Sequence, residues 1–213
     1  MKNINIIDLK SSSDDYLEKE YEICIVGAGA AGIYLATEFA KKGIETVLLE
    51  AGGESTVNAN IAGFNAKVEG EMYLGASEGR YFGLGGTTSH WGGVLIPHTK
   101  HDIKGTGDTF EIWKHIINVV ETKCNVVLEK LGWQKESGFF NSRKIQGNKY
   151  KKLFNSKGIS LMSDLHLPFR KKNLNFLLKK IPKNNKLQIF INSVVYELDS
   201  FKSSDSEIIR SLK

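Results

Sequence analysis

Cysteine, proline and long apolar runs are all scarce in this sequence. Its 213 residues include 2 cysteines and 3 prolines. Two cysteines cannot build a disulfide framework or a metal cage, so we expect Cys24 and Cys124 to be buried thiols. No run approaches the roughly 20 apolar residues of a membrane span. Residues 1–15 also lack the apolar segment and cleavage site of a secretory signal. The expectation is a soluble, cytoplasmic protein with no membrane span and no metal.

Acidic residues are scarce in one stretch. Between Arg143 and Lys186 the chain carries thirteen lysines and arginines and a single acid, Asp164, although the net charge of the whole chain is only +5. Such a stretch could bind nucleic acid or an acidic membrane surface. No recognition helix, zinc pattern or pair of stacking aromatics accompanies it. We therefore interpret it as a solvated face without a nucleic-acid partner, and a binding protein that uses this face stays an alternative.

Glycine, in contrast, is abundant. The chain has 21 glycines, about 10% where about 7% is usual, and most of them lie between Gly27 and Gly107. The few prolines argue against a low-complexity linker. Glycines concentrated in one stretch indicate a backbone that lies close to a ligand.

The first glycine cluster lies inside a βαβ pattern. Residues 21–26 are apolar and β-branched, which predicts a strand buried on both faces. Residues 33–42 carry an apolar helical stripe and end in lysines, and Gly43 follows where a helix end favours positive φ. Residues 45–50 predict the second strand. The whole unit has the length that βαβ units normally have.

The spacing Gly27-x-Gly29-x-x-Gly32 between strand and helix predicts a dinucleotide site. Gly27 allows the tight turn, Gly29 lets a pyrophosphate approach the backbone, and Gly32 lets helix and strand pack closely. The helix N-terminus offers N–H groups to the phosphates. Glu50 is placed to accept hydrogen bonds from ribose hydroxyls, and its charge argues against the 2′-phosphate of NADP. The alternative is a glycine-rich turn in an α/β domain that binds no nucleotide.

The predicted fold class is α/β, a Rossmann-type parallel sheet with flanking helices. Further helices are expected over 110–131 and over 173–181, where Pro182 ends the second one. Strands are expected over 187–191 and 194–198. We divide the chain into a leader over 1–20 and one dinucleotide-binding domain over 21–213, in which 100–185 is a less certain insertion.

A second glycine cluster spans Arg80–Gly93. Its last ten positions contain four glycines, three hydroxyl residues and the pair His90-Trp91. Together with Tyr21–Gly32 and Leu48–Gly53, this segment resembles the glucose–methanol–choline oxidoreductases, flavoenzymes that oxidise alcohols and sugars. The similarity covers the FAD-binding part of that family, from about residue 21 to the end, with little that matches over 100–185.

The resemblance implies an FAD-dependent oxidoreductase that acts on CH–OH groups, with an alcohol or sugar substrate and an unknown electron acceptor. His90 has the register of the histidine that carries the flavin covalently in pyranose oxidase and related sugar dehydrogenases. Val195 has the position of a valine whose backbone meets the adenine. The cofactor-binding residues expected from the motif and the resemblance are Gly27, Gly29, Ala30, Ala31, Gly32, Glu50, Ala51, Arg80, Gly85, Gly86, Thr87, His90, Trp91, Gly92 and Val195.

The sequence departs from that family in its length. Family members are usually more than twice as long, and their catalytic base and substrate domain lie near the C-terminus. We therefore expect this chain to lack both, and we assign no catalytic residue. His98, His101 and Asp102 do not suggest a metal site, because no further ligand has suitable spacing. A non-catalytic FAD-binding fragment and, less well supported, an NAD-dependent reductase are the alternatives.

Overall fold

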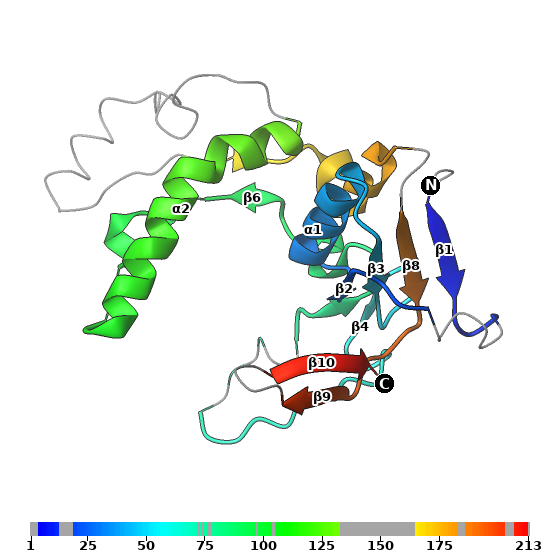
Figure 1. Cartoon of the computed structure of the whole chain (residues 1–213). Helices are drawn as coiled ribbons and strands as arrows, with labels where there is room; N and C mark the ends of the chain where they lie inside the picture. The colour runs from blue at the N-terminus through cyan, green and yellow to red at the C-terminus, as the bar shows by residue number, and fades with distance from the viewer. Residues whose placement is uncertain are drawn as a thin grey trace, which may run out of the picture. The chain divides into compact units, whose positions relative to one another are not determined.

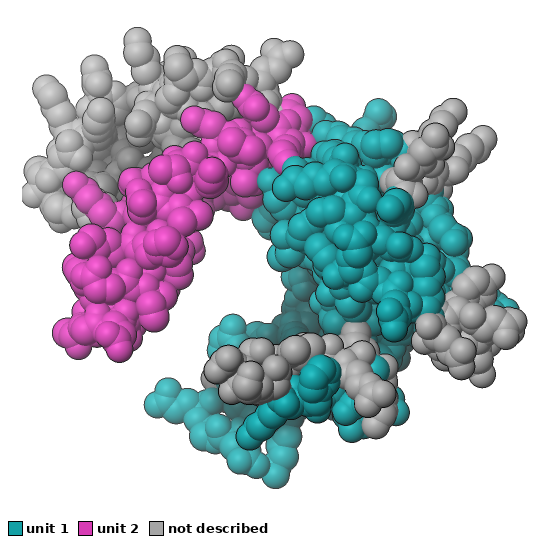
Figure 2. Space-filling model, viewed as in Figure 1, with its two compact units in different colours: residues 1–91, 170–213 teal, residues 92–169 magenta. Residues whose placement is uncertain are grey.

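The computed structural model describes residues 4–12, 19–71, 73, 75, 78–96, 98–103, 105–132, 165–182, 186–202 and 207–212. These residues form two compact units (Figure 2), the first from residues 1–91 and 170–213 and the second from residues 92–169. The predicted insertion covered 100–185, whereas residues 170–185 are here counted with the first unit. Most of the basic stretch from Arg143 to Lys186 lies outside the described residues.

The first unit is built on a parallel sheet of four strands (Figure 1). The strands are β1 (Asn5–Asp8), β2 (Ile23–Val26), β3 (Thr46–Leu49) and β8 (Leu187–Ile191), in the order β1-β8-β3-β2. All three pairings are parallel, and Leu48 pairs with both Ile25 and Ile189. The α/β fold with a parallel sheet is confirmed. Part of the predicted leader over 1–20 is a strand of this sheet, because β1 pairs with β8.

Helix α1 (Ala30–Lys41) follows β2 as the βαβ pattern predicts. It buries Ile33, Ala36 and Ala40, which recur at helical spacing and lie on one face. The helix ends in two bonds, from Gly43 N to the carbonyl of Ala40 and from Ile44 N to that of Phe39. This is the Schellman arrangement, and Gly43 has the positive φ it needs, 74°.

The two faces of the sheet are covered differently. On one face, α1 contacts β2 and β3 and packs against η6, a 3-10 helix over Leu174–Lys180 (Figure 1). η6 replaces the helix expected over 173–181 and ends just before Pro182. On the other face, Ile7, Val47 and Phe190 form a buried cluster, with Leu9, Tyr21 and Leu49 packed against it.

Strand β2 lies at an edge of this sheet, with β3 as its neighbour. Cys24 is exposed and Val26 is 58% exposed. The prediction of a strand buried on both faces is therefore wrong for β2, because only Ile25 in it is buried. The prediction of two buried thiols is also wrong, since Cys124 in the second unit is only partly buried.

Short elements complete the first unit. β4 (Val57–Asn58) pairs antiparallel with β5 (Tyr81–Phe82), and the 3-10 helix η3 (Gly86–Ser89) follows β5. β9 (Leu198–Lys202) and β10 (Glu207–Leu212) form an antiparallel pair. The strand predicted over 194–198 is wrong, because residues 193–197 are irregular and β9 begins only at Leu198.

The second unit contains helix α2 and a small sheet. α2 spans Asp108–Lys130 and buries Ile117 and Leu128, so the helix predicted over 110–131 is confirmed. β6 (Val94–Leu95) pairs antiparallel with β7 (Leu165–His166). The remaining elements are two 3-10 helices, η4 (Lys100–Asp102) and η5 (Phe169–Lys171), the latter at the boundary between the units.

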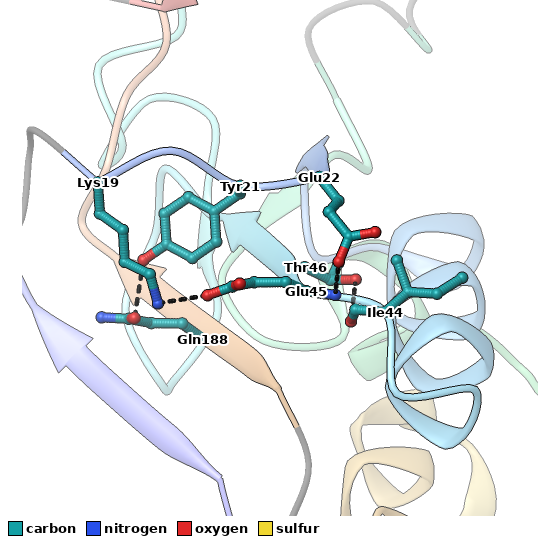
Figure 3. A network of polar contacts seen from close by, with 7 residues as sticks. All are labelled: Lys19, Tyr21, Glu22, Ile44, Glu45, Thr46 and Gln188. Atoms are coloured by element: carbon teal, nitrogen blue, oxygen red, sulfur yellow. Dashed lines mark hydrogen bonds and ion pairs between the residues drawn. The ribbon is translucent and has the colours of Figure 1, made fainter.

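The amino ends of the strands of the parallel sheet carry a network of side chains (Figure 3). Lys19 Nζ lies 2.6 Å from Glu45 Oε1 and 4.8 Å from the centre of the Tyr21 ring. The Tyr21 hydroxyl donates to Gln188 Oε1 at 2.7 Å. Glu22 Oε1 accepts from the backbone N–H of Glu45 at 3.3 Å. These contacts tie the segment before β2 to the first residues of β3 and β8.

Candidate functional site

Three chain segments meet at the carboxyl ends of the strands of the parallel sheet. Gly27–Gly29 follows β2, Glu50–Gly53 follows β3, and Asn192–Val195 follows β8. Because the carboxyl ends of parallel strands lie at one edge of a sheet, and ligands of such sheets bind there, this edge is the candidate site.

The segment after β2 makes the turn into α1. Gly27 has a φ of 95°, which strongly favours glycine, and its N–H donates to the carbonyl of Leu49 at 2.7 Å. A β-carbon on Gly32 would collide with the carbonyl oxygen of Gly27. Both glycines therefore have the backbone roles that the sequence predicted for them.

Gly29 differs from these two, because a β-carbon built on it meets no atom within 4 Å. Gly29 is the N-cap of α1; it supplies no side-chain cap, and the first turn of the helix has no acidic residue. A helix N-terminus of this kind attracts anions, since its N–H groups point outward and the helix dipole is positive there. The open space beside Gly29 thus has the chemistry that a phosphate requires.

Glu50 connects the loops of the site through its carboxylate. The residue is buried, with 4% of its surface exposed. Its Oε2 accepts from Ala28 N at 2.6 Å, and its Oε1 accepts from Gly52 N at 2.9 Å and from Gly83 N at 2.8 Å. The role expected for Glu50, binding ribose hydroxyls, stays a prediction. What the structure adds is that one carboxylate holds three backbone segments together.

The Gly83–Gly86 segment packs directly on the dinucleotide loop. Gly85 N donates to the carbonyl of Ala28 at 2.9 Å. A β-carbon on Gly86 would lie 3.1 Å from Gly29 Cα, and one on Gly83 would lie 2.7 Å from the carbonyl oxygen of Ser55. The two glycine clusters found in the sequence therefore touch each other, and glycine is needed where their backbones meet.

Two residues of the second cluster anchor it to η6 and the segment before it. Thr88 Oγ1 accepts from Leu174 N at 3.1 Å, and Trp91 Nε1 donates to the carbonyl of Lys172 at 2.7 Å. A β-carbon on Gly85 would collide with the side chain of Asn173. The Trp91 indole N–H is thus engaged by the protein itself.

His90 lies at the C-cap of η3. Its imidazole stacks on the Tyr81 ring, with a centroid distance of 3.6 Å and an angle of 1° between the planes. Its Nδ1 lies 2.7 Å from Ser89 Oγ. The side chain is exposed, and its ring is held from two sides.

The segment after β8 is tied to the same edge. Asn192 N donates to the carbonyl of Gly52, and Ser193 N donates to that of Glu50, both at 2.8 Å. Asn192 has a φ of 54°, so the chain turns away from the sheet there. Val195 follows this turn and is half-buried. Its contact with an adenine stays a prediction.

The other residues expected at the site are distributed as follows. Ala30 and Ala31 are in the first turn of α1, and Ala51 lies between Glu50 and Gly52. Arg80, directly before β5, and Thr87, in η3, are both exposed. Gly92 belongs to the second unit.

Sequence reasoning missed four residues that shape the site: Ala28, Gly52, Gly83 and Asn173. Gly52 and Gly83 lie inside the glycine motifs. Their contacts with Glu50 are made by backbone N–H groups, which every residue except proline has, so the residue type could not indicate them. Asn173 lies far from the motifs in sequence and reaches the loop through its side chain, with Nδ2 3.4 Å from the carbonyl of Leu84.

Among the residues that the structure describes, no three His, Cys, Asp or Glu side chains are grouped so that they could hold a metal ion. None of the helices described has the length and apolar character needed to cross a membrane.

A family model described as an FAD binding domain matches residues 20–68. The match contains β2, α1 and β3 with the loops after both strands. A comparison with curated proteins finds no match. The matching family is that of aromatic hydroxylases and monooxygenases, so the assignment to the glucose–methanol–choline oxidoreductases is wrong. The oxidation of CH–OH groups and a covalent FAD at His90 lose their support with it, whereas FAD as the cofactor keeps it.

Proposed function

We propose that this chain is the FAD-binding part of a flavin-dependent oxidoreductase. The match to an FAD binding domain over residues 20–68 carries this proposal. It covers the strand–helix–strand unit whose loops form the candidate site. FAD supplies the redox chemistry when it is bound, and the protein supplies binding and orientation.

The residues at the carboxyl edge of the sheet fit the diphosphate of FAD. Gly29 leaves open space at the N-terminus of α1, where backbone N–H groups would bind the phosphates. Glu50 and the segment after β8 lie at the same edge, where the adenosine half would bind. The proposal names neither a substrate nor a covalent bond to the cofactor.

The sharpest test is Gly29→Val. Because nothing lies within 4 Å of a β-carbon there, the variant should fold, with a modest loss of stability from a poorer N-cap. Its side chain would occupy the space of the diphosphate, so we expect FAD to bind at least about tenfold more weakly, a cost of about 1.4 kcal/mol or more. Flavin fluorescence titration measures this, with circular dichroism as the check on folding.

Leu35→Ala is the matched control, since Leu35 is exposed on the same helix. It should bind FAD as the wild type does. A folded Gly29→Val variant with wild-type FAD affinity would contradict the proposal. Titration with NAD in place of FAD separates the proposal from a nicotinamide-dependent reductase, because NAD binding without FAD binding would favour that alternative.

A further inference from the structure

Ser89 Oγ is the centre of a hydrogen-bond cluster next to the dinucleotide loop. Three polar atoms surround it: the carbonyl oxygen of Gly86 at 2.7 Å, Thr56 Oγ1 at 2.8 Å and His90 Nδ1 at 2.7 Å. Thr56 stands directly before β4, and the other three residues belong to η3 and its C-cap.

The chemistry of these atoms determines where the protons lie. A hydroxyl has one proton to donate and two lone pairs to accept with, whereas a carbonyl can only accept. The proton of Ser89 must therefore go to Gly86. The two lone pairs of Ser89 Oγ then accept from the Thr56 hydroxyl and from an N–H at His90 Nδ1.

The other arrangements are costly. If Ser89 donated to His90 or Thr56 instead, its oxygen would face the carbonyl oxygen of Gly86 at 2.7 Å with no proton between them. An acceptor that faces another acceptor loses its hydrogen bond and is partly desolvated. The tautomer of a neutral histidine follows from the hydrogen bond at its other ring nitrogen.

We propose that Ser89 is a positioning residue that keeps the proton of neutral His90 on Nδ1 and so leaves Nε2 as a hydrogen-bond acceptor for bound FAD. Stacking on Tyr81 fixes the plane of the ring, and the bond to Ser89 fixes its rotation within that plane. Within the described part of the chain, no hydrogen bond engages Nε2.

The position of the cluster connects it to the proposed cofactor site. η3 begins at Gly86, which lies against Gly29, and His90 ends the same helix. Nε2 can accept a hydrogen bond from an N–H or O–H group of a ligand, and FAD carries both kinds of donor. This last step rests on the proposed function, whereas the tautomer rests only on the contacts of Ser89.

Nitrogen-15 NMR of histidine-labelled full chain tests both steps. His90→Gln identifies the His90 signals among those of the five histidines. In the alkaline range, where imidazole is neutral, we expect the wild type to show a protonated Nδ1 and an unprotonated Nε2. Ser89→Ala should lose this pattern and give a mixture of tautomers, and Ser89→Thr should restore it. Thr56→Val is the matched control and should keep it, because it removes a donor to Ser89 and leaves the His90 bond.

Addition of FAD gives the second readout. The Nε2 resonance of the wild type should shift as a hydrogen bond to FAD forms, while Nδ1 stays protonated. A wild type with the proton on Nε2, or a Ser89→Ala spectrum identical to that of the wild type, would overturn the role of Ser89. FAD binding that leaves the Nε2 resonance in place would overturn the acceptor role. If fluorescence shows no FAD binding at all, the proposed function and the acceptor role fail together, while the apo spectra still decide the tautomer.

Discussion

The two ends of the parallel sheet are held together by different chemistry. At the carboxyl end, one buried carboxylate accepts three backbone N–H groups. At the amino end, the ion pair between Lys19 and Glu45 is well exposed, with 51% and 32% of the two side chains open to solvent (Figure 3). Both ends join segments that are distant in sequence, but they differ in the burial of the charged group and in the kind and number of its contacts.

Burial changes what a charged contact contributes. Water and salt screen the charges of an exposed pair, and two long side chains lose entropy when they form it. When a buried carboxylate is removed, water does not take its place, so the N–H groups that donated to it remain without an acceptor. We therefore expect the carboxyl end to be rigid and sensitive to substitution, and the amino end to be tolerant.

Glu50→Ala should have the largest effect. It leaves the N–H groups of Ala28, Gly52 and Gly83 without their acceptor, and we expect the free energy of unfolding to fall by about 3–5 kcal/mol. Urea denaturation measures the loss, and Glu54→Ala, an exposed acid nearby, is the control. A loss below about 1 kcal/mol would show that water satisfies these groups and would remove the contrast between the two ends.

Gly32→Ala should come next. Its new methyl group would collide with the backbone carbonyl of Gly27, and overpacking of this kind costs about 1–3 kcal/mol. Gly53→Ala is the matched control, because the nearest atoms to a β-carbon there are 3.9 Å away. Thermal unfolding of the two variants compares them directly. Equal melting temperatures would mean that α1 can shift away from β2 at little cost.

Tyr21→Phe removes one hydroxyl at the amino end. The ring keeps its place against the Ile7, Val47 and Phe190 cluster, and only the bond to Gln188 is lost. A single neutral hydrogen bond contributes about 1 kcal/mol. Chemical denaturation should show a loss of this size, while Gln188→Glu keeps an acceptor and should lose less. A loss as large as that of Glu50→Ala would contradict the ranking of the two ends.

Lys19→Ala should have the smallest effect. The hydrogen bond to Lys19 lowers the pKa of Glu45 below its ordinary value of 4.5, and the bond to Glu45 raises the pKa of Lys19 above 10.5. The pair therefore stabilises the fold between these ordinary values. Its contribution is lost as the pH falls through the lowered pKa of Glu45 or rises through the raised pKa of Lys19.

The measurement is the difference in unfolding free energy between Lys19→Ala and the wild type at neutral pH and at about pH 3. We expect a small difference at neutral pH, a smaller one in acid, and none at high salt. Lys10→Ala, an exposed lysine outside the pair, is the control. A difference that persists in acid or in high salt would mean that Lys19 acts through packing on Tyr21 rather than through its charge.

Local patterns in the sequence were enough to predict the βαβ unit and the C-terminal end of its helix, whereas α1 begins at Ala30, three residues before the predicted stripe. Local contacts determine these features. The helical stripe of Ile33, Ala36 and Ala40 reflects packing against neighbouring elements, and Gly43 reflects hydrogen bonds within the last turn of the helix. The same reasoning found β8 as a strand. Sequence reasoning could not place β8 between β1 and β3, because the residues of an apolar strand do not indicate which strand it pairs with.

The errors have physical causes of the same kind. The run from Ile23 to Val26 is apolar as a buried strand would be, yet β2 lies at the edge of the sheet. Val194 and Val195 favour a strand by residue type, but the positive φ of Asn192 and the bonds from Asn192 and Ser193 to the loop after β3 turn the chain away first. Tertiary contacts overrode local propensity in residues 193–197, whereas β2 formed as the predicted strand and only its burial differs.

The order of the strands also determines when this sheet can form. Ile6 of β1 pairs with Ile189 of β8, so about 180 residues separate two strands that are neighbours in the sheet. At about 5–20 residues per second, a ribosome needs roughly 10–40 seconds to make the chain between them. During that interval β2 and β3 can pair and pack against α1, while the other edge of β3 has no partner strand. An unpaired strand edge is a site of aggregation, so this edge of β3 is prone to aggregation until β8 has been synthesised.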